Sequence, residues 1–381
     1  MKEKDENKEF NWGPGIFLIA YHAILIPLLP VYFWLSPPSW SLVLVTIALY
    51  FMTGLSITAG YHRYFSHRSF KAHPFVEFIM VVLGTLSGQG SVIRWSYDHR
   101  LHHAHVDTEQ DPYSIQKGFW YAHCLWLFEK PREIDEKIIP DLIKKPLLRW
   151  QHHYYGTFFT LLNFASFLFF GWCFGDYIGA FMMTWWIRLF ALHHSTWFIN
   201  SLAHTWGDKP FCQEHSAVNN YVISLLTFGE GYHNYHHTFA NDYRNGIKWY
   251  HFDPTKWLIK GLNFFGLTYD LKLVDPLTIK KKMILERRSL VMSKLQELWY
   301  VKREDLEVKL QDISESILVK IRRMNELKQK YRSLKKNYKE KGLLLEIKKE
   351  LKLIKKSLQK EWRLWKRFSN LILKLKPLQP I

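Results

Sequence analysis

The sequence has few cysteines, and its first residues do not have the pattern of a signal peptide; both observations narrow the class of protein. Its three cysteines, Cys124, Cys173 and Cys212, are too few and too widely spaced for a disulfide framework or a Cys-x-x-Cys metal site. The first ten residues, MKEKDENKEF, carry charges of both signs and lack the apolar core of a signal peptide. We therefore expect no cleaved signal peptide and a cytosolic N-terminal segment over residues 1–14.

Charged residues are absent from several long parts of the chain. A mean hydropathy of −0.18 excludes a chain that is apolar throughout, but 17% of the residues are aromatic, which favours a membrane protein. Four apolar stretches are long enough to cross a bilayer, at roughly 15–35, 40–60, 156–175 and 177–200. The connections within each pair are too short to carry a domain, so the four stretches form two hairpins.

The two hairpins predict the topology of the chain. If residues 1–14 are cytosolic, each hairpin returns the chain to that side, and residues 61–155 and 201–381 are cytosolic too. The short turns on the opposite side contain no Lys or Arg, in agreement with the positive-inside rule. The predicted fold is an all-α integral membrane domain over residues 15–275, with four transmembrane helices in two hairpins and a cytosolic helical cap. We expect the apolar stretch 74–93 at the interface or under this cap.

Residues 276–381 form a region of different composition. They contain 30 of the 52 Lys and Arg but only 12 of the 34 Asp and Glu, which leaves 22 residues of each sign elsewhere. Apolar residues recur every three or four positions from Leu306 to Leu334 and again from Leu351 to Trp365, which predicts long helices. We expect a basic helical tail that forms a coiled coil or helical hairpin and can self-associate. The alternative is an amphipathic element on anionic membrane lipid. No nucleic-acid motif is present, so nucleic-acid binding is not expected.

Histidines are concentrated in the rest of the chain, between His22 and His251. Eight of them fall into three clusters, His62 and His67, then His99, His102 and His103, then His233, His236 and His237. In the second and third clusters, the i, i+3, i+4 spacing places three imidazoles on one face of a helix. Eight neutral imidazoles exceed what one metal ion can accept, so the clusters predict two metal ions. The other histidines lie outside this spacing and are expected to be structural or at the surface.

The order of these clusters around two membrane hairpins resembles the membrane fatty acyl desaturases, and their flanks resemble the acyl-CoA delta-9 (stearoyl-CoA) branch. The matching segments are Gly60-Tyr-His-Arg-Tyr-Phe-Ser-His-Arg68, Asp98-His-Arg-Leu-His-His103, Asn200-Ser-Leu-Ala-His204 and Gly229-Glu-Gly-Tyr-His-Asn-Tyr-His-His-Thr238. Residues 242–250 are similar to the fungal members in particular. The resemblance covers about residues 10–275.

This resemblance implies a cofactor and a set of site residues. It implies two Fe(2+) ions with O2 as co-substrate, His204 as a ninth ligand, and Asn200 as a residue that supports one iron through water. It implies a bent acyl tunnel whose kink is set by Trp95, Thr196 and Trp197, with Tyr50 and Gly54 near its closed end. Near the mouth it implies three residues that bind coenzyme A, namely Asp98, Arg100 and Arg188.

The function that we expect from this resemblance is fatty acyl-CoA desaturation. In this reaction O2 and two electrons are used to form a cis double bond, at the delta-9 position, in a saturated acyl chain. The sequence has no flavin or dinucleotide fingerprint and no His-Pro-Gly-Gly haem segment, so a separate cytochrome b5-like or ferredoxin-like protein is the expected electron donor. The active site is expected on the cytosolic face of a multi-pass protein, in the endoplasmic reticulum if eukaryotic or the cytoplasmic membrane if bacterial.

Three alternatives to this function stay open at the level of sequence. Gly90 and the segment Glu129-Lys130-Pro131 depart from the pattern of the animal enzymes, which leaves the acyl carrier open. An acyl-lipid or acyl-carrier-protein desaturase and a fatty acid hydroxylase would use the same kind of metal site. A zinc-binding membrane scaffold is the alternative from another class, with the basic tail as its interaction arm.

Overall fold

The computed structural model describes residues 9–298, 300–336 and 341–376, so residues 1–8 of the expected N-terminal segment lie outside the described part. The chain divides into two compact units. Unit 1 comprises Met1–Lys209 and His215–Leu273, and unit 2 comprises Pro210–Glu214 and Val274–Ile381.

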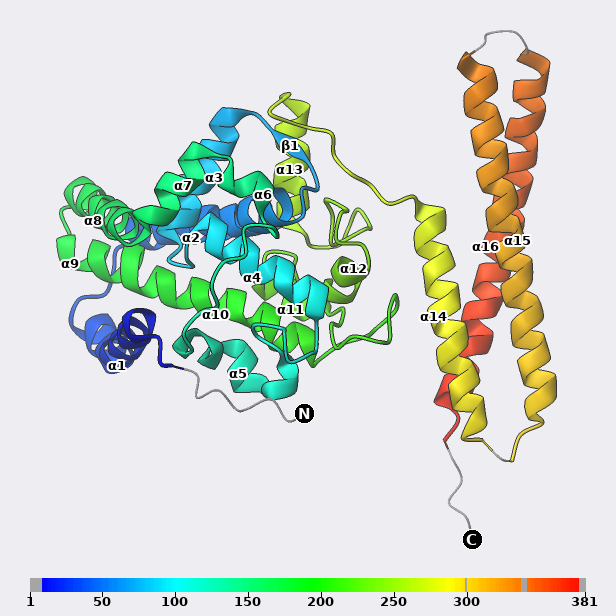
Figure 1. The fold of residues 1–381 in the computed structure, drawn as a ribbon, viewed down its shortest axis with the longest axis horizontal. Coiled ribbons are helices and arrows are strands. Elements are labelled where there is room, and N and C mark those ends of the chain that lie inside the picture. The colour runs from blue at the N-terminus through cyan, green and yellow to red at the C-terminus, as the bar shows by residue number, and fades with distance from the viewer. Residues whose placement is uncertain (1–8, 299, 337–340, 377–381) are drawn as a thin grey trace. The chain divides into compact units, whose positions relative to one another are not determined.

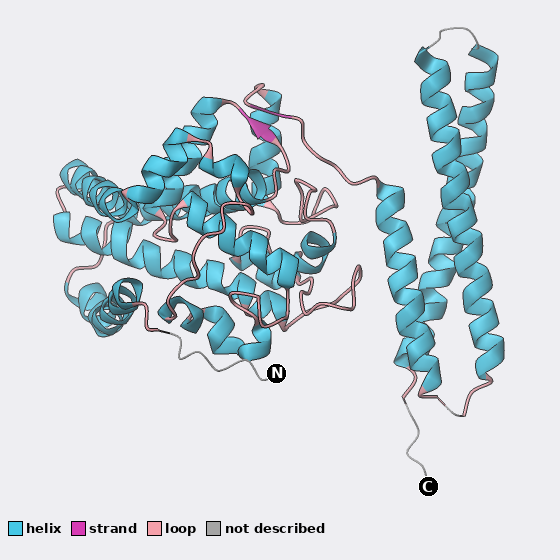
Figure 2. Ribbon diagram, in the orientation of Figure 1, coloured by secondary structure: helices cyan, strands magenta, loops and turns pink. Residues whose placement is uncertain are grey.

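Unit 1 is mainly helical, with loops between the helices (Figures 1 and 2). Its long helical runs are α1 (Trp12–Leu35), α2 (Trp40–Leu55) with the π-helix η1 (Ser56–Ser66), α8 (Tyr155–Phe174), and α9 (Tyr177–Ala180) with the π-helix η4 (Phe181–Ile187) and α10 (Arg188–Asn200). Its shorter helices are α3 (Pro74–Leu86), α4 (Val92–His105), η2 (Ile115–Lys117), α5 (Phe119–His123), η3 (Leu125–Phe128), α6 (Pro140–Ile143), α7 (Pro146–His153), η5 (Leu202–His204), α11 (Tyr221–Leu226), α12 (His233–Thr238) and α13 (Pro254–Phe264). Two short strands, β1 (Lys71–Ala72) and β2 (Thr268–Tyr269), pair antiparallel.

Among the described residues, three helical runs are long and apolar enough to cross a membrane. They are Trp12–Leu35, Trp40–Ser66 and Tyr155–Phe174. Large apolar side chains on the first and third runs are exposed, among them Trp34 and Trp172, as expected for a surface that contacts lipid rather than water. We therefore describe unit 1 as a membrane unit.

The fourth expected span, residues 177–200, is helical without a break through α9, η4 and α10. It is not among the three runs, because Arg188, His193 and His194 interrupt its apolar character. The four-span topology and its cytosolic cap therefore stay predictions. Helix α3 has 13 residues, about 20 Å of helix, which is too short to cross a bilayer.

A buried ion-pair network joins η1 to the C-terminal part of unit 1. The guanidinium of Arg63 is 1% exposed and donates to the carboxylates of Asp253, at 3.0 and 3.2 Å, and of Glu230, at 2.9 Å. It also donates to the carbonyl oxygen of Tyr243 at 2.8 Å. Because each of these charges has a partner of opposite sign, their burial is tolerated, and η1 is held at a fixed place beside residues 230–253.

Unit 2 is a bundle of three helices, α14 (Pro276–Gln296), α15 (Arg303–Lys336) and α16 (Lys341–Lys374). One apolar core runs along it, built from Leu277, Ile284, Val291, Leu295, Leu298, Leu310, Ile317, Ile321, Met324, Leu358, Trp365 and Ile372. The largest of these side chains, Trp365, is 1% exposed and donates its Nε1–H to Ser314 Oγ at 3.1 Å. The expected helical stripes lie in this core together with α14, while the coiled coil and self-association stay predictions.

Candidate metal centre

Nine histidines of unit 1 form two groups in which one ring nitrogen of every member lies within 4.8 Å of those of the others. The first group contains His62, His67, His99, His103 and His236, and the second contains His102, His204, His233 and His237. The eight histidines of the three sequence clusters are all present. The ninth is His204, which the cluster spacing alone did not single out.

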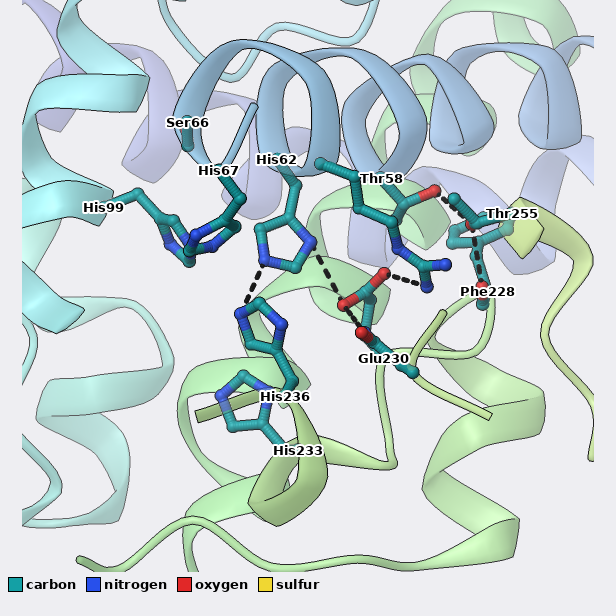
Figure 3. A network of polar contacts seen from close by, with 12 residues as sticks. Thr58, His62, Ser66, His67, His99, Phe228, Glu230, His233, His236 and Thr255 are labelled. Carbon is teal, nitrogen blue, oxygen red and sulfur yellow. Dashed lines mark hydrogen bonds and ion pairs between the residues drawn. The ribbon is translucent and has the colours of Figure 1, made fainter. Parts of the chain in front are cut away.

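The π-helical winding of η1 brings the first two histidines together. The backbone N–H of His67 donates to the carbonyl oxygen of His62, five residues back, at 3.1 Å. In an α-helix, residues five apart point in directions about 140° apart, whereas the wider π turn places them on one side. The two rings are 4.9 Å apart between centroids, and Figure 3 shows both facing the same space as His99 and His236.

Helices α4 and α12 divide their histidines between the two groups. On α4, His99 and His103 belong to the first group and His102 to the second, and on α12 His236 belongs to the first and His233 and His237 to the second. The i, i+3, i+4 spacing predicted three imidazoles on one face of each helix but not how they are shared between metal ions. In the structure each of the two helices contributes to both groups.

The spacing of the ring nitrogens suits a metal ion. In the first group the Nε2 atoms of His62 and His103 are each 2.9 Å from Nε2 of His236, and those of His67 and His99 are 2.8 Å apart. In the second group, Nε2 of His237 is 3.2 Å from that of His102 and 3.1 Å from that of His233. For metal–nitrogen bonds of about 2.1 Å, two ligands at right angles are about 3.0 Å apart. The observed spacing therefore fits histidines that share one ion in each group.

Buried carboxylates fix which nitrogen of two histidines carries the proton. Glu230 accepts from Nδ1 of His62 at 3.1 Å, and Asp111 accepts from Nδ1 of His102 at 2.9 Å. An ionised carboxylate can only accept, so the proton is on Nδ1 and Nε2 keeps its lone pair. Two Nε2 lone pairs that face each other at about 3 Å repel unless a cation lies between them. The donor set therefore fits a metal on chemical grounds as well as by distance.

In His204, a serine hydroxyl backed by a carboxylate fixes the proton on Nδ1. Ser216 Oγ donates to Asp107 Oδ1 at 2.5 Å and accepts from Nδ1 of His204 at 2.6 Å. Nε2 of His204 is buried and has no hydrogen-bond partner among the described residues. A buried nitrogen lone pair without a donor is costly, so this atom also indicates a place for a bound cation.

Burial keeps the imidazoles in the form that binds metal. It lowers the pKa of His67, His99, His103, His204, His233, His236 and His237 well below the usual histidine value, with repulsion between neighbouring rings as a smaller cause. Burial alone would raise the pKa of Glu230, but the attraction of His62 and Arg63 outweighs it and holds that pKa below its usual range. The site therefore combines neutral ligands with an ionised carboxylate behind them.

A cavity of about 1810 Å³ reaches both histidine groups. Its lining includes His62 and His99 of the first group, His102 and His233 of the second, and Trp95, Asp98, Thr196, Trp197 and Asn200 from the sequence prediction. The ring of Trp95 stacks on His99 at 4.9 Å. Gln89, which sequence analysis did not identify, donates from Nε2 to Thr196 Oγ1 at 2.9 Å and also lines the cavity.

Charged side chains also line this cavity, among them Arg94, Asp98, Lys130 and Arg132. Arg94 pairs with Asp98 at 3.3 Å. Burial raises the pKa of Asp98 to about 6, against the attraction of Arg94 and Arg132. The cavity thus has a charged region as well as an apolar one.

Four predicted substrate residues do not line this cavity. Tyr50 donates to or accepts from Ser195 Oγ at 2.7 Å, and the α-carbon of Gly54 lies so close to the ring of Phe228 that a Cβ would be 2.2 Å from it. Arg100 holds both carboxylate oxygens of Asp141, at 2.8 and 2.9 Å. These contacts place Tyr50, Gly54 and Arg100 in the packing of unit 1.

Arg188 is the fourth, and its side chain is buried within unit 1. Its side chain is 1% exposed and donates to Asn163 Oδ1 at 2.5 Å and to the carbonyl oxygens of Thr184 and Leu86, at 2.6 and 3.2 Å. Since the guanidinium groups of Arg100 and Arg188 are both engaged by protein atoms, we do not include them among the head-group residues proposed below.

The groups that orient these histidines were not predicted from the sequence; they are Asp107, Asp111, Ser216 and Glu230. Glu230 lies inside the segment Gly229–Thr238 that carries the third cluster, and Asp111 follows the second cluster by eight residues. Each could have been suspected from this proximity. Nothing in the sequence, however, distinguishes a buried acid from the many exposed ones.

Comparison with known proteins places the chain in a family. The model of the family "Fatty acid desaturase" matches residues 12–270. The "Probable acyl-CoA desaturase" of Schizosaccharomyces pombe is 39% identical over 280 residues, which are 71% of this chain and 58% of that protein. "Acyl-CoA desaturase 1" of Saccharomyces cerevisiae is 38% identical, over 76% of this chain and 57% of that protein. The "sn-2 palmitoyl-lipid 9-desaturase" of Nostoc sp. is 37% identical, over 70% of this chain and 91% of that protein. The match thus spans less than two thirds of the two yeast proteins.

Proposed function

The chain belongs to the fatty acid desaturase family, and from this premise we propose that it is an oxygen-dependent desaturase that forms a cis delta-9 double bond in a saturated fatty acyl-CoA. The resemblance found in the sequence is thereby confirmed at the level of the family. The histidine groups that could hold metal ions, together with the family, support an iron-type cofactor. We propose two Fe(2+) ions, one in each group.

The observation that carries this proposal is that both histidine groups contribute to the wall of one cavity. Removing hydrogen from two unactivated methylenes requires a strong oxidant, which iron and O2 supply when bound. The residues of the chain have the task of placing one carbon–carbon bond beside the histidines. Trp95, Thr196 and Trp197 line the same cavity and are proposed to set the bend of the acyl chain there.

The surroundings of the ligands fit this role. Glu230 and Asp111 hold the Nδ1 protons of His62 and His102, and Asp107 does so for His204 through Ser216. These partners fix the ring orientations before any ion binds, so little rearrangement is needed. Asn200 lines the cavity and is proposed to support the second group, which has one histidine fewer than the first. The electrons are proposed to come from a separate cytochrome b5-like or ferredoxin-like donor.

We propose coenzyme A as the acyl carrier, because cationic side chains line the cavity. Arg94, Lys130 and Arg132 line it, and cationic side chains suit the phosphates of coenzyme A. Asp98 is proposed to orient Arg94 through their ion pair.

An acyl-lipid 9-desaturase is the second candidate, because the chain covers 91% of the length of the Nostoc lipid desaturase. A phospholipid could enter the same cavity from the bilayer with its head group beside the same cations.

One experiment separates these functions. The full chain is purified in lipid nanodiscs after expression with iron, and given stearoyl-CoA, an electron donor and O2, with stearoyl-phospholipid in a parallel reaction. We expect two irons per chain and an oleoyl product from the CoA substrate, with the bond located by mass spectrometry. A double bond formed only in phospholipid would favour the second candidate, and hydroxylated products would indicate a hydroxylase. Zinc with no O2 consumption would overturn both proposals in favour of a scaffold.

A further inference from the structure

A row of cations follows one side of α16 in unit 2. Lys349, Lys356, Lys360, Arg367 and Lys374 are seven, four, seven and seven residues apart, which are close to whole helical turns. We call these five residues the basic stripe, and all five are exposed. The residues two positions after Lys356 and Arg367 are buried in the bundle, and two positions are about 200° around a helix. The basic stripe therefore faces away from the core.

Three exposed leucines run beside the basic stripe. Leu353 is 69% exposed, Leu364 51% and Leu371 65%. Each follows a stripe cation by four residues, so each is the neighbour of that cation on the helix surface. We call these three residues the leucine row. Three large apolar side chains aligned on the outer face contribute nothing to the core of the bundle, so this face needs another explanation.

The charge of this face is only partly offset by acids on the same helix. Helix α16 contains 11 Lys and Arg but only three Glu. Two of these, Glu350 and Glu361, pair with Arg323 and Lys320 of α15, at 2.9 and 2.7 Å. Those two acids are therefore committed to the contact between the helices. The third, Glu346, is exposed and lies three residues before Lys349, so it offsets one of the five cations, and the outer face of α16 keeps a net positive charge.

We propose that the basic stripe and the leucine row together bind a membrane surface that contains anionic phospholipid. Cations beside an apolar row on one helix face are the arrangement of interfacial helices, in which the apolar side chains enter the head-group region and the cations contact lipid phosphates. Charge complementarity alone would also suit nucleic acid or an acidic protein, but nucleic acid offers nothing to the leucine row.

The connectivity of the chain supports this partner. Unit 1 is a membrane unit, and only residues 270–275 separate β2 from α14. A lipid surface is thus always present at the high effective concentration that a short tether provides. The proposal assigns a binding role to unit 2 that does not depend on the proposed desaturation.

The test measures binding of the full chain to added vesicles. The protein is held in nanodiscs of neutral phosphatidylcholine and mixed with sedimentable vesicles of phosphatidylcholine alone or with about 30% phosphatidylserine. We expect cosedimentation with the anionic vesicles only, and weaker binding as NaCl rises. In the variant Lys349→Gln/Lys356→Gln/Lys360→Gln/Arg367→Gln, we expect binding to weaken by roughly 100-fold or more.

A matched control tests whether position matters or only total charge. The variant Arg322→Gln/Lys330→Gln/Arg332→Gln/Lys335→Gln removes four exposed cations from α15 and is expected to keep its affinity within about threefold. The variant Leu353→Ser/Leu364→Ser/Leu371→Ser is expected to lose the part of the binding that survives high salt. Hydrogen exchange along α16 verifies that each variant keeps its helices.

Two outcomes would overturn the proposal. The first is a wild-type chain that binds anionic vesicles no better than neutral ones, including one that instead dimerises or binds an acidic protein. The second is a control variant that weakens binding as much as the stripe variant. Because vesicle binding and iron content are measured separately, failure of this proposal is distinct from failure of the proposed desaturase function.

Discussion

The two units of this chain are both helical, but they place polar groups in opposite ways. Unit 1 contains every histidine of the chain and buries charged residues such as Arg63, Arg188 and Glu230. Among the described residues of unit 2, the buried polar side chains are Ser314 and Ser369. Unit 2 is thus stabilised by apolar packing. In unit 1, buried polar groups lower the stability of the fold but position the candidate metal centre.

The largest expected effect is on the metal centre. Replacing His236→Ala removes the ring whose Nε2 contacts those of His62 and His103, and we expect iron to be lost from the first group and desaturation to fall at least about 1000-fold. Metal analysis and product assays provide the measurement, with the exposed His153→Ala as control. A chain that keeps two irons and its activity in His236→Ala would refute the assignment of this residue as a ligand.

Lowering the pH should destabilise unit 1 but not unit 2. In the metal-free protein, the seven histidines with lowered pKa stay neutral when folded but bind protons when unfolded, so stability decreases as pH falls through about 6.5. Together these histidines would lower the stability of unit 1 by on the order of 5 kcal/mol between pH 7 and pH 6.

Unit 2 contains no histidine, so its stability should not change over this range. Hydrogen exchange at both pH values, corrected for the intrinsic rate, reports α4 and α12 separately from α15 and α16. Equal loss of protection in the two units would contradict the comparison.

Unit 2 should be sensitive to a cavity in its core and insensitive to metal. We expect Trp365→Ala to destabilise it by about 3–5 kcal/mol, because the side chain is fully buried and its hydrogen bond to Ser314 is lost. Exchange in α14, α15 and α16 should rise, while the iron content of unit 1 is unchanged. The exposed Leu345→Ala is the control, and loss of iron in Trp365→Ala would show that the units are coupled.

The smallest effect is expected when a residue that hydrogen-bonds to a metal-binding histidine is replaced. Asp111→Asn keeps the shape of the side chain but weakens the acceptor for the Nδ1 proton of His102, so iron affinity should fall about 10- to 100-fold. Competition with a chelator measures this affinity. Asp141→Asn, which affects the Arg100 contact instead, should leave it unchanged. An equal decrease in both variants would indicate a general effect on folding.

The sequence allowed one part of the site to be predicted and not the other. Spacing identified His62, His67 and both triads, because ligands on one helix repeat at helical intervals. It missed the Nδ1 partners Asp111 and Glu230, because nothing in the sequence distinguishes a buried acid from an exposed one. It also could not show that α4 and α12 each serve two groups, since that depends on how the helices pack.

The fold, too, could be predicted from the sequence only in part. The apolar stripes of α15 and α16 were predictable because one face of each is buried along its length. The helical run 177–200 was also predicted, but its buried Arg188 and its histidines make it less apolar than a typical span. The role expected for Arg188 at the mouth of the tunnel did not account for its engagement by Asn163 and two backbone carbonyls.

The wide winding of η1 has a consequence for protein design. Grafting this histidine pair onto a regular α-helix would require a spacing of four residues, because five residues of α-helix would turn the second ring away. Conversely, an insertion that widens one helical turn can convert two unrelated positions into partners. The pair His62 and His67 therefore shows that a wider helical turn can bring together two side chains that a regular α-helix would separate.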